Sequence, residues 1–388
     1  ILSPEEVEEL KREAKEKGQK IECIPSKMVY TLKPGMDGGR KKARLVACGN
    51  FEEKKKDEST YSSGADAAAF RIMIWISARE SWQACTLDVK TAFLNADMSV
   101  QEDDGLILIK PPPIFQEKNY VPKGVMYQPL KAVYGFRRSP RLWSLLRDQT
   151  MRDFRIHVLE NGQEKVLVLL QLNSEPNLWK IAVQGEEEEP TMTNGMMRGL
   201  VMSYVDDLFV TGPSYVVEAV KAKFEETWAT SKPEYVGEHP VRFLGMEVKK
   251  ERKAEDEREV WYVTQESYIS DLLSKEHGLK ERKIPISRDQ SLMETTADPP
   301  TAEQIKQCQK EVGEALWLVT RTRPDLMFAV SRMGSNITKP ADAVLEVSRQ
   351  LKGYLLKTKE EGLKYDESPG KPIAVNAFSD AAFAPVGE

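Results

Sequence analysis

The chain has 388 residues and a net charge of −5, with 40% hydrophobic and 30% charged residues, which is typical of a globular protein of two or three domains. Four scattered cysteines and three histidines argue against a zinc site or a disulfide scaffold, and for a reducing compartment. No apolar run approaches the ~20 residues that span a bilayer, and the charged N-terminus does not resemble a secretion signal.

The N-terminal part predicts a helix, a strand pair and a second helix. The chain begins with Ile rather than Met, so we expect it to be a piece of a longer protein. Residues 3–18 open with Ser3 and Glu6 in the pattern of a capping box, which marks a helix start. Residues 24–51 predict two short strands around a glycine-rich turn, and residues 65–80 predict a helix.

The middle of the chain predicts one more helix followed by paired strands. A helix beginning at Ser139 carries Leu142, Leu145 and Leu146 on one side, which we expect to be its apolar face. The runs "VLVLLQL" and "LWKIAVQ" predict paired strands, and an acidic, loop-like stretch at 186–189 follows. The runs "VRFLGMEV" and "VWYVTQ" predict the two strands of a further hairpin.

Beyond that hairpin the pattern changes to helices. Thr301 and Gln304 form a second capping box before an apolar-periodic run that Pro324 interrupts. Residues 341–357 predict another helix, and the proline-rich segment 295–301 is the expected linker.

Three carboxylates attract attention among these elements. Asp206 and Asp207 stand at the tip of the hairpin expected for "SYVDDLFVTG", without the glycine that tight turns favour. Such an unfavourable local choice indicates function, although a solvated turn is the commoner explanation. The strand "ACTLDV" carries Asp88, which needs a partner if it is buried. That partner is either Lys90 or, through a hard cation such as Mg²⁺, Asp206.

Six motifs give this pattern a family resemblance. "KARLVACGNF", "LDVKTAFLNA", "LKAVYGFRRSPRLW", "SYVDDLFVTG", "RFLGMEV" and "TRTRPDLMFAVS" occur in order. Together they resemble the reverse transcriptase of copia-type LTR retrotransposons over roughly residues 21–365. The resemblance implies an α+β right-hand polymerase with fingers, a palm built on an antiparallel sheet and a thumb, followed by a helical connection and the start of an RNase H-like domain. The implied units are an N-terminal helix (1–20), fingers and palm (21–262), thumb and connection helices (263–365) and a truncated RNase H-like start (366–388).

The resemblance implies an RNA-directed DNA polymerase that transfers nucleotides from dNTPs to a primer 3′-OH on an RNA or DNA template. Two Mg²⁺ ions, with Mn²⁺ as a substitute, would be held by Asp88, Asp206 and the main-chain carbonyl of Val89, with Asp207 as a weaker ligand. The implied partners are the RNA template, the DNA primer/template, dNTPs and other modules of a parent Pol polyprotein. No membrane is implied, and an oligomer is compatible. The expected location is the cytoplasm, including virus-like particles, with access to the nucleus.

Further roles are implied for residues around the carboxylates. Phe93 would lie beneath the sugar and exclude a ribose 2′-OH, although core packing alone would also explain an aromatic residue there. Lys42, Arg44, Tyr134 and Gly135 would contact the incoming nucleotide. Template or primer contacts are implied for Arg137, Arg138, Arg141, Phe243, Leu244 and Gly245.

Departures from the family pattern leave alternatives open. Cys48 stands where the family usually has arginine. "AFSDAAFAP" resembles the start of an RNase H domain with Asp380 as its first metal ligand, but the chain ends before the others, so we expect no RNase H activity. The basic stretches 41–44, 54–56 and 137–147 predict a nucleic-acid groove with salt-dependent affinity, or solvated faces. The alternative functions are a catalytically inactive nucleic-acid-binding relic of a decayed element and, with less support, a metal-dependent phosphohydrolase.

Overall fold

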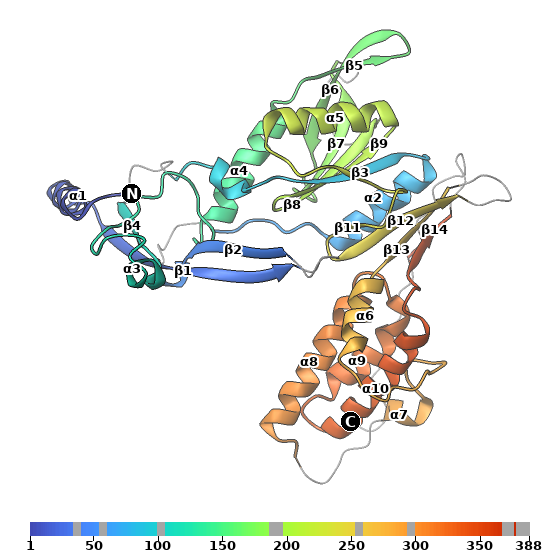
Figure 1. The fold of residues 1–388 in the computed structure, drawn as a ribbon. Coiled ribbons are helices and arrows are strands. Elements are labelled where there is room, and N and C mark those ends of the chain that lie inside the picture. Colours follow the sequence, from blue (N-terminus) through green and yellow to red (C-terminus); the bar gives the residue numbers. More distant parts are fainter. Residues whose placement is uncertain are drawn as a thin grey trace.

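The computed structural model describes residues 1–33, 40–53, 60–98, 105–185, 197–252, 259–292, 299–366 and 376–377. In these ranges the chain forms a three-stranded, a seven-stranded and a four-stranded sheet, with helices packed on them and a separate helical unit (Figure 1). Among the strands of these ranges, every pair is antiparallel except that of β1 and β4. The predicted α+β class is confirmed.

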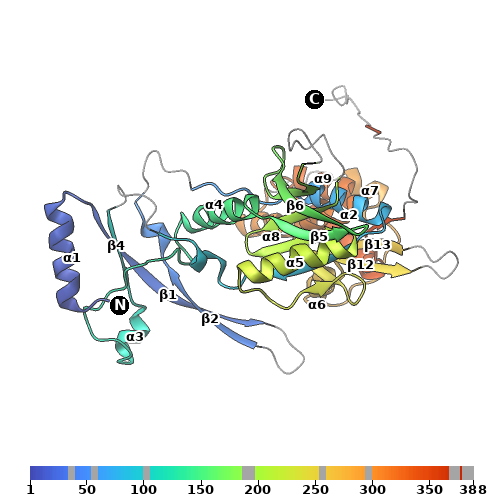
Figure 2. The same cartoon turned by 90° about the horizontal axis from the view of Figure 1, so that it is seen from above.

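The N-terminal part lies at one end of the molecule (Figures 1 and 2). Its sheet has the order β2-β1-β4. The capping box of Ser3 and Glu6 forms as predicted, because both of its hydrogen bonds are local. The two strands predicted in residues 24–51 also form, although the first is long, with 13 residues. The elements here are α1 (Pro4–Glu16), β1 (Ile21–Lys33), β2 (Arg40–Ala47), β4 (Leu106–Lys110) and α3 (Pro113–Glu117).

The seven-stranded sheet has the order β10-β3-β9-β8-β7-β6-β5. Its strands are β3 (Gln83–Asp88), β5 (Ile156–Glu160), β6 (Gln163–Gln171), β7 (Leu178–Val183), β8 (Gly199–Tyr204), β9 (Asp207–Gly212) and β10 (Glu234–Tyr235). Helices α4 (Ser139–Arg152) and α5 (Ser214–Thr227) cover one face, and α2 (Ala67–Arg79) covers the other. Alternate residues of β9 therefore enter different cores: Leu208 and Val210 face α5, whereas Phe209 packs on Phe70 of α2.

The buried face of α4 differs from the prediction. The helix begins at Ser139 as predicted, and Leu142 packs against the core, but Leu145 remains 51% exposed and Leu146 is also exposed. The buried positions are instead spaced four residues apart and include Trp143, Arg147 and Met151. Arg147 lies in the middle of this buried series, so a search for apolar residues alone does not find the face. Its burial is possible because Asp148 neutralises its charge, and the periodicity of apolar residues does not reveal that pair.

The third sheet has the order β11-β12-β13-β14 and packs on α2 through its own apolar face. Its strands are β11 (Val241–Phe243), β12 (Met246–Arg252), β13 (Glu259–Thr264) and β14 (Leu363–Tyr365). The prediction of a single strand in "VRFLGMEV" was wrong. Leu244 and Gly245 both have positive φ, 51° and 74°, and make a tight turn between β11 and β12.

The helical unit follows β13 and has its own core, which includes Leu318, Val344 and Leu351. Its helices are α6 (Glu266–Ser274), α7 (Arg288–Leu292), α8 (Ala302–Val319), α9 (Met327–Ser335) and α10 (Ala341–Lys357). The capping box at the start of α8, the interruption at Pro324 and the bounds of α10 are as predicted. The predicted linker lies largely outside the described residues. Across the described ranges, no helix combines the length and the apolar character that a membrane span requires.

The predicted division after residue 262 falls inside β13, which continues to Thr264. The helical unit begins at Glu266 and returns to the third sheet through β14, which pairs with β13. The helical unit is therefore inserted between β13 and β14, two paired strands of the four-stranded sheet (Figure 1).

Candidate active site

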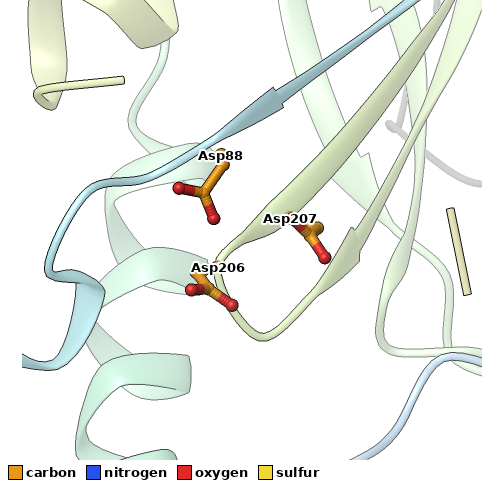
Figure 3. A group of neighbouring side chains, drawn as sticks. All are labelled: Asp88, Asp206 and Asp207. Carbon is orange, nitrogen blue, oxygen red and sulfur yellow. The ribbon is translucent and has the colours of Figure 1, made fainter. Parts of the chain in front are cut away.

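Three carboxylates meet where β3 ends and the β8–β9 hairpin turns (Figure 3). Asp88 is the last residue of β3 and pairs in register with Asp207, the first residue of β9. The N–H of Val89 donates to the Asp206 carbonyl at 2.8 Å, which brings the turn beside the end of β3. One oxygen from each of the three carboxylates lies within 4.8 Å of the others. Like charges this close repel, and an all-oxygen ligand set suits a hard divalent cation.

The turn itself is one residue earlier than the sequence suggested. Tyr204 pairs with Asp207, so Val205 and Asp206 are the two turn residues and Asp207 belongs to the strand. Val205 has φ +56°, a region that β-branched residues rarely adopt and that tight hairpin turns usually give to glycine. The turn is therefore strained, and its conformation depends on contacts from outside the hairpin.

The end of β3 is held from the other side by residues 229–231. The N–H of Asp88 donates to Ser231 Oγ at 2.9 Å, and the N–H of Ser231 donates to the Asp88 carbonyl at 2.8 Å. The N–H of Lys90 donates to the Ala229 carbonyl at 2.8 Å. Lys90 was the alternative partner of Asp88, but its side chain is exposed. The main chain of Asp88 is thus fixed while its carboxylate faces the other two.

Phe93 and Tyr134 lie together beside the carboxylates. Phe93 belongs to a 3₁₀ turn, Ala92–Asn95, and is 9% exposed, with its ring centroid 4.7 Å from that of Tyr134. Burial, and then the negative charges of Asp206 and Asp88, raise the pKa of Tyr134 above its usual value. The guanidinium of Arg44 lies 5.8 Å from the Tyr134 ring centroid.

Gly135 allows the end of β2 to lie close to Tyr134. Its φ is +98°, and a Cβ at this position would collide with the carbonyl oxygen of Ala47. The neighbouring Tyr134 carbonyl accepts a hydrogen bond from the Ala47 N–H at 2.8 Å. Lys42 and Arg44, which are two residues apart on β2, share one face of that strand. The glycine therefore sets how closely the N-terminal sheet approaches the carboxylates.

Arg137 and Arg138, which were predicted to bind the template, contact residues 49–52 instead of facing open solvent. The Arg137 N–H donates to Glu52 Oε2 at 2.7 Å, and its Nε donates to the Gly49 carbonyl at 2.8 Å. Arg138 is 8% exposed, with its Nε 3.8 Å from Glu52 Oε1. These contacts favour a structural role for both, which sequence reasoning missed; the acidic Glu52 beside a basic motif was the available signal.

Few of the other basic residues predicted to line a nucleic-acid groove are both described and exposed. Arg147 is buried, whereas Arg141 is partly exposed and donates from Nη1 to the Tyr61 carbonyl at 3.3 Å. The basic stretch 54–56 and Asp380 lie outside the described residues. Of the arginines in the 137–147 stretch, Arg141 thus remains the best placed for a phosphate contact.

The turn at Leu244 and Gly245 touches the helical unit. A Cβ on Gly245 would lie 2.8 Å from the Trp317 ring of α8. Arg321 lies 3.2 Å over the Trp317 ring and donates from Nε to the Leu244 carbonyl at 3.2 Å. Phe243 is buried and packs on Phe209 of β9, with ring centroids 5.5 Å apart. The turn is therefore linked both to the carboxylate-bearing hairpin and to α8.

Comparison with known proteins identifies the domain. Residues 14–169 match a family model described as "Reverse transcriptase (RNA-dependent DNA polymerase)". This part of the chain is a reverse transcriptase domain. The matched range includes Asp88, Phe93 and Tyr134.

Curated relatives of this reverse transcriptase domain come from transposons. The chain is 24% identical over 374 residues to a retrovirus-related Pol polyprotein from transposon RE2, and 26% identical over 392 residues to one from transposon RE1, both of Arabidopsis thaliana. It is 25% identical over 301 residues to the putative transposon Ty5-1 protein of Saccharomyces cerevisiae, covering 76% of this chain and 83% of that protein. The expected relationship to reverse transcriptases of copia-type Pol polyproteins is confirmed.

The chain covers only part of the polyproteins. The alignments include 94% of this chain but 22% of each Arabidopsis polyprotein. The roles of individual residues in this reverse transcriptase domain stay predictions.

Proposed function

We propose that this chain is the RNA-directed DNA polymerase unit of a retrotransposon Pol polyprotein and extends a primer 3′-OH with dNTPs on an RNA or DNA template. The single observation that carries the proposal is the meeting of Asp88, Asp206 and Asp207 within 4.8 Å in a chain with a reverse transcriptase domain. Nucleotidyl transfer asks a protein mainly for positioning and charge neutralisation, which clustered carboxylates on fixed strand ends can supply.

In this proposal Asp88, Asp206 and the main-chain carbonyl of Val89 hold two Mg²⁺ ions, or Mn²⁺, and Asp207 shapes the site as a weaker ligand. When bound, the ions would supply charge neutralisation at the attacking and leaving oxygens. The residues of the chain keep the carboxylates in place: Ser231 braces Asp88, and the N–H of Val89 ties the turn to β3. Such pre-formed geometry avoids reorganisation during the reaction.

The incoming dNTP would lie against Phe93 and Tyr134, with its phosphates toward Lys42 and Arg44 on β2. The aromatic pair is adjacent to the carboxylates, since the charges of Asp206 and Asp88 reach Tyr134. Gly135 would serve nucleotide binding by letting β2 approach Tyr134. Planar guanidinium groups bind phosphate oxygens in pairs, which suits Arg44 for the triphosphate.

Replacing Phe93 by valine should admit ribonucleotides. The smaller side chain leaves room for the 2′-OH, so we expect the ratio of ribo- to deoxynucleotide incorporation to rise on the order of 10- to 100-fold. Single-nucleotide incorporation with dTTP and UTP measures this ratio. Phe154→Val, which removes a buried ring from the same core, is the control and should leave the ratio unchanged. An unchanged ratio in active Phe93→Val would show that Phe93 is only a core residue.

The right-hand arrangement would then be distributed over the three-stranded sheet, the seven-stranded sheet and the helical unit. We assign β1, β2 and β4 to the fingers, the seven-stranded sheet with α2, α4 and α5 to the palm, and α6–α10 to the thumb and connection. The turn at Phe243, Leu244 and Gly245 would guide the primer end, with Arg141, and to a lesser degree Arg137 and Arg138, nearer the template. The start of an RNase H-like domain after residue 366 and association with other polyprotein modules belong to the same proposal.

Primer extension on a poly(rA) template with an oligo(dT) primer, dTTP and Mg²⁺ tests the assignment. Product that depends on primer, template and metal is expected. Binding of primer/template that is unchanged by EDTA, without any synthesis, would identify the chain as a catalytically inactive relic. Release of nucleotides without a primer would point to a phosphohydrolase.

A further inference from the structure

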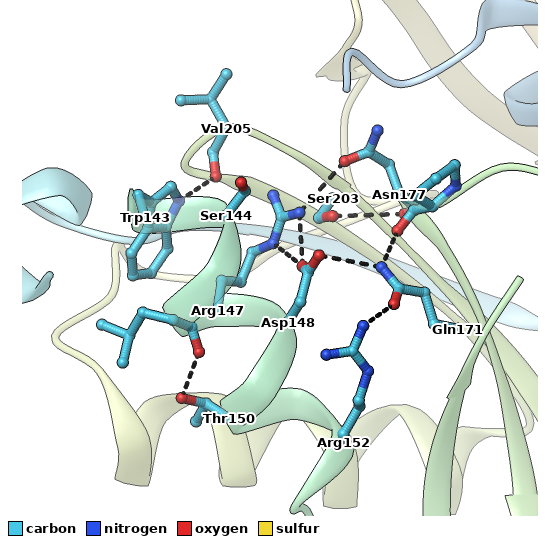
Figure 4. A network of polar contacts seen from close by, with 12 residues as sticks. Trp143, Ser144, Arg147, Asp148, Thr150, Arg152, Gln171, Asn177, Ser203 and Val205 are labelled. Carbon is cyan, nitrogen blue, oxygen red and sulfur yellow. Dashed lines mark hydrogen bonds and ion pairs between the residues drawn. The ribbon is translucent and has the colours of Figure 1, made fainter. Parts of the chain in front are cut away.

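The strained turn that carries Asp206 is held by helix α4. Trp143 of this helix is 1% exposed, and its indole Nε1 donates to the Val205 carbonyl at 2.6 Å (Figure 4). The ring is fixed in turn by Trp228, which packs edge-to-face on it with centroids 5.3 Å apart. The carbonyl that receives the hydrogen bond belongs to the residue with φ +56° and is joined directly to Asp206.

A second contact from the same helix reaches the strand that leads into the turn. Arg147, one helical turn after Trp143, is buried and binds Asp148 Oδ1 through Nε and Nη2 at 2.9 and 2.7 Å. Its Nη2 also lies 3.3 Å from Asn177 Oδ1, and the Asn177 carbonyl accepts the Ser203 N–H at 2.9 Å. Figure 4 shows these contacts on one side of α4, facing β8. The helix therefore fixes both the turn and the strand before it.

We infer that Trp143 is a positioning residue for the carboxylate site: its indole N–H holds the Val205 carbonyl, and thereby sets the direction in which Asp206 presents its carboxylate. This inference rests on the proposed function for its catalytic consequence, but not for its effect on metal binding. A glycine in this turn would adopt the positive φ without strain, whereas Val205 stores strain that the hydrogen bond must offset. Loss of a group that orients a metal ligand commonly weakens metal affinity by about 10- to 100-fold.

The test compares Trp143→Phe with Trp228→Phe in the full 388-residue chain. The first removes the indole N–H and keeps an aromatic ring. The second replaces the indole of Trp228, whose ring packs on Trp143, Phe154 and Phe224, and leaves the Trp143 N–H in place. Mn²⁺ binding, followed by electron paramagnetic resonance, is expected to weaken on the order of 10-fold in Trp143→Phe and to stay near wild type in Trp228→Phe. In primer extension, kcat should fall with Trp143→Phe while KM for dTTP is retained.

A double substitution separates positioning from general packing. Val205→Gly removes the steric strain of the positive φ, so Trp143→Phe should cost much less Mn²⁺ affinity in the Val205→Gly background than in the wild-type background. Equal losses in both backgrounds, or equal losses from Trp143→Phe and Trp228→Phe, overturn the inference. Unchanged Mn²⁺ affinity in folded Trp143→Phe overturns it too.

Other outcomes distinguish this inference from the proposed function. A wild-type chain that binds Mn²⁺ with the expected dependence on Trp143 and yet extends no primer would refute the polymerase assignment. This result would leave the positioning role of Trp143 intact. If Trp143→Phe does not fold, ¹⁵N-indole spectra of the wild type decide: a solvent-protected Nε1–H resonance should shift with Mg²⁺ at the midpoint of metal binding. Absence of any such shift, or of Mn²⁺ binding by wild type, overturns the inference.

Discussion

Replacing Asp206 by asparagine is expected to reduce primer extension by a factor on the order of 10³, which corresponds to about 4 kcal/mol of transition-state stabilisation. Asparagine keeps the shape of the side chain but lacks the charge that would hold a divalent cation, and such a cation is worth several kcal/mol to a phosphoryl transfer. Single-turnover extension of a primer by dTTP with saturating Mg²⁺ measures the effect.

The same substitution should not destabilise the fold. Without metal the three carboxylates repel one another within 4.8 Å, so removing one charge should leave the free energy of unfolding unchanged or raise it. Asp271→Asn, which removes an exposed carboxylate of α6 paired with Lys275, is the matched control and should retain wild-type extension. Activity of Asp206→Asn equal to that of the control would refute the proposed site.

Replacing Lys352 by methionine is expected to destabilise the protein by about 3–5 kcal/mol, because it leaves a buried charge without its partner. Lys352 of α10 is 6% exposed and lies 2.6 Å from Glu311 of α8, which is equally buried. Burial opposes charge on both groups, but the hydrogen bonds outweigh it: the pKa of Glu311 is held below its usual value and that of Lys352 above it. Urea denaturation at pH 7 measures the loss.

The loss should depend on pH in a defined direction. Glu311 contributes stability above the pKa of an unfolded glutamate, about 4.3, and this contribution is lost as pH falls. In Lys352→Met the unpaired carboxylate takes up a proton more readily, so the deficit relative to wild type should shrink towards pH 4. Lys275→Met, which breaks an exposed pair, should change the unfolding free energy by less than about 1 kcal/mol. Similar losses from the two variants would contradict the buried-pair explanation.

The sequence correctly predicted those features whose interacting residues are close together in the chain. Both capping boxes, at Ser3 and at Thr301, join residues three positions apart, so the sequence contains both partners side by side. The bounds of α10 follow from its apolar spacing for the same reason. Where a partner came from elsewhere, the sequence contains no local signal: the buried face of α4 depends on its contacts with the sheet. The burial of Arg138 beside Glu52 likewise has no local pattern.

The sequence by itself determined the order of the elements, the family resemblance and the three acidic residues of the proposed site, because each is written in a short run of neighbours. Only the tertiary structure decided that Val205, not Asp207, shares the turn with Asp206, and that Trp143 holds it. Strand register and a hydrogen bond between distant segments carry no local pattern, since they arise only when the hydrophobic faces of β8, β9 and α4 are buried together.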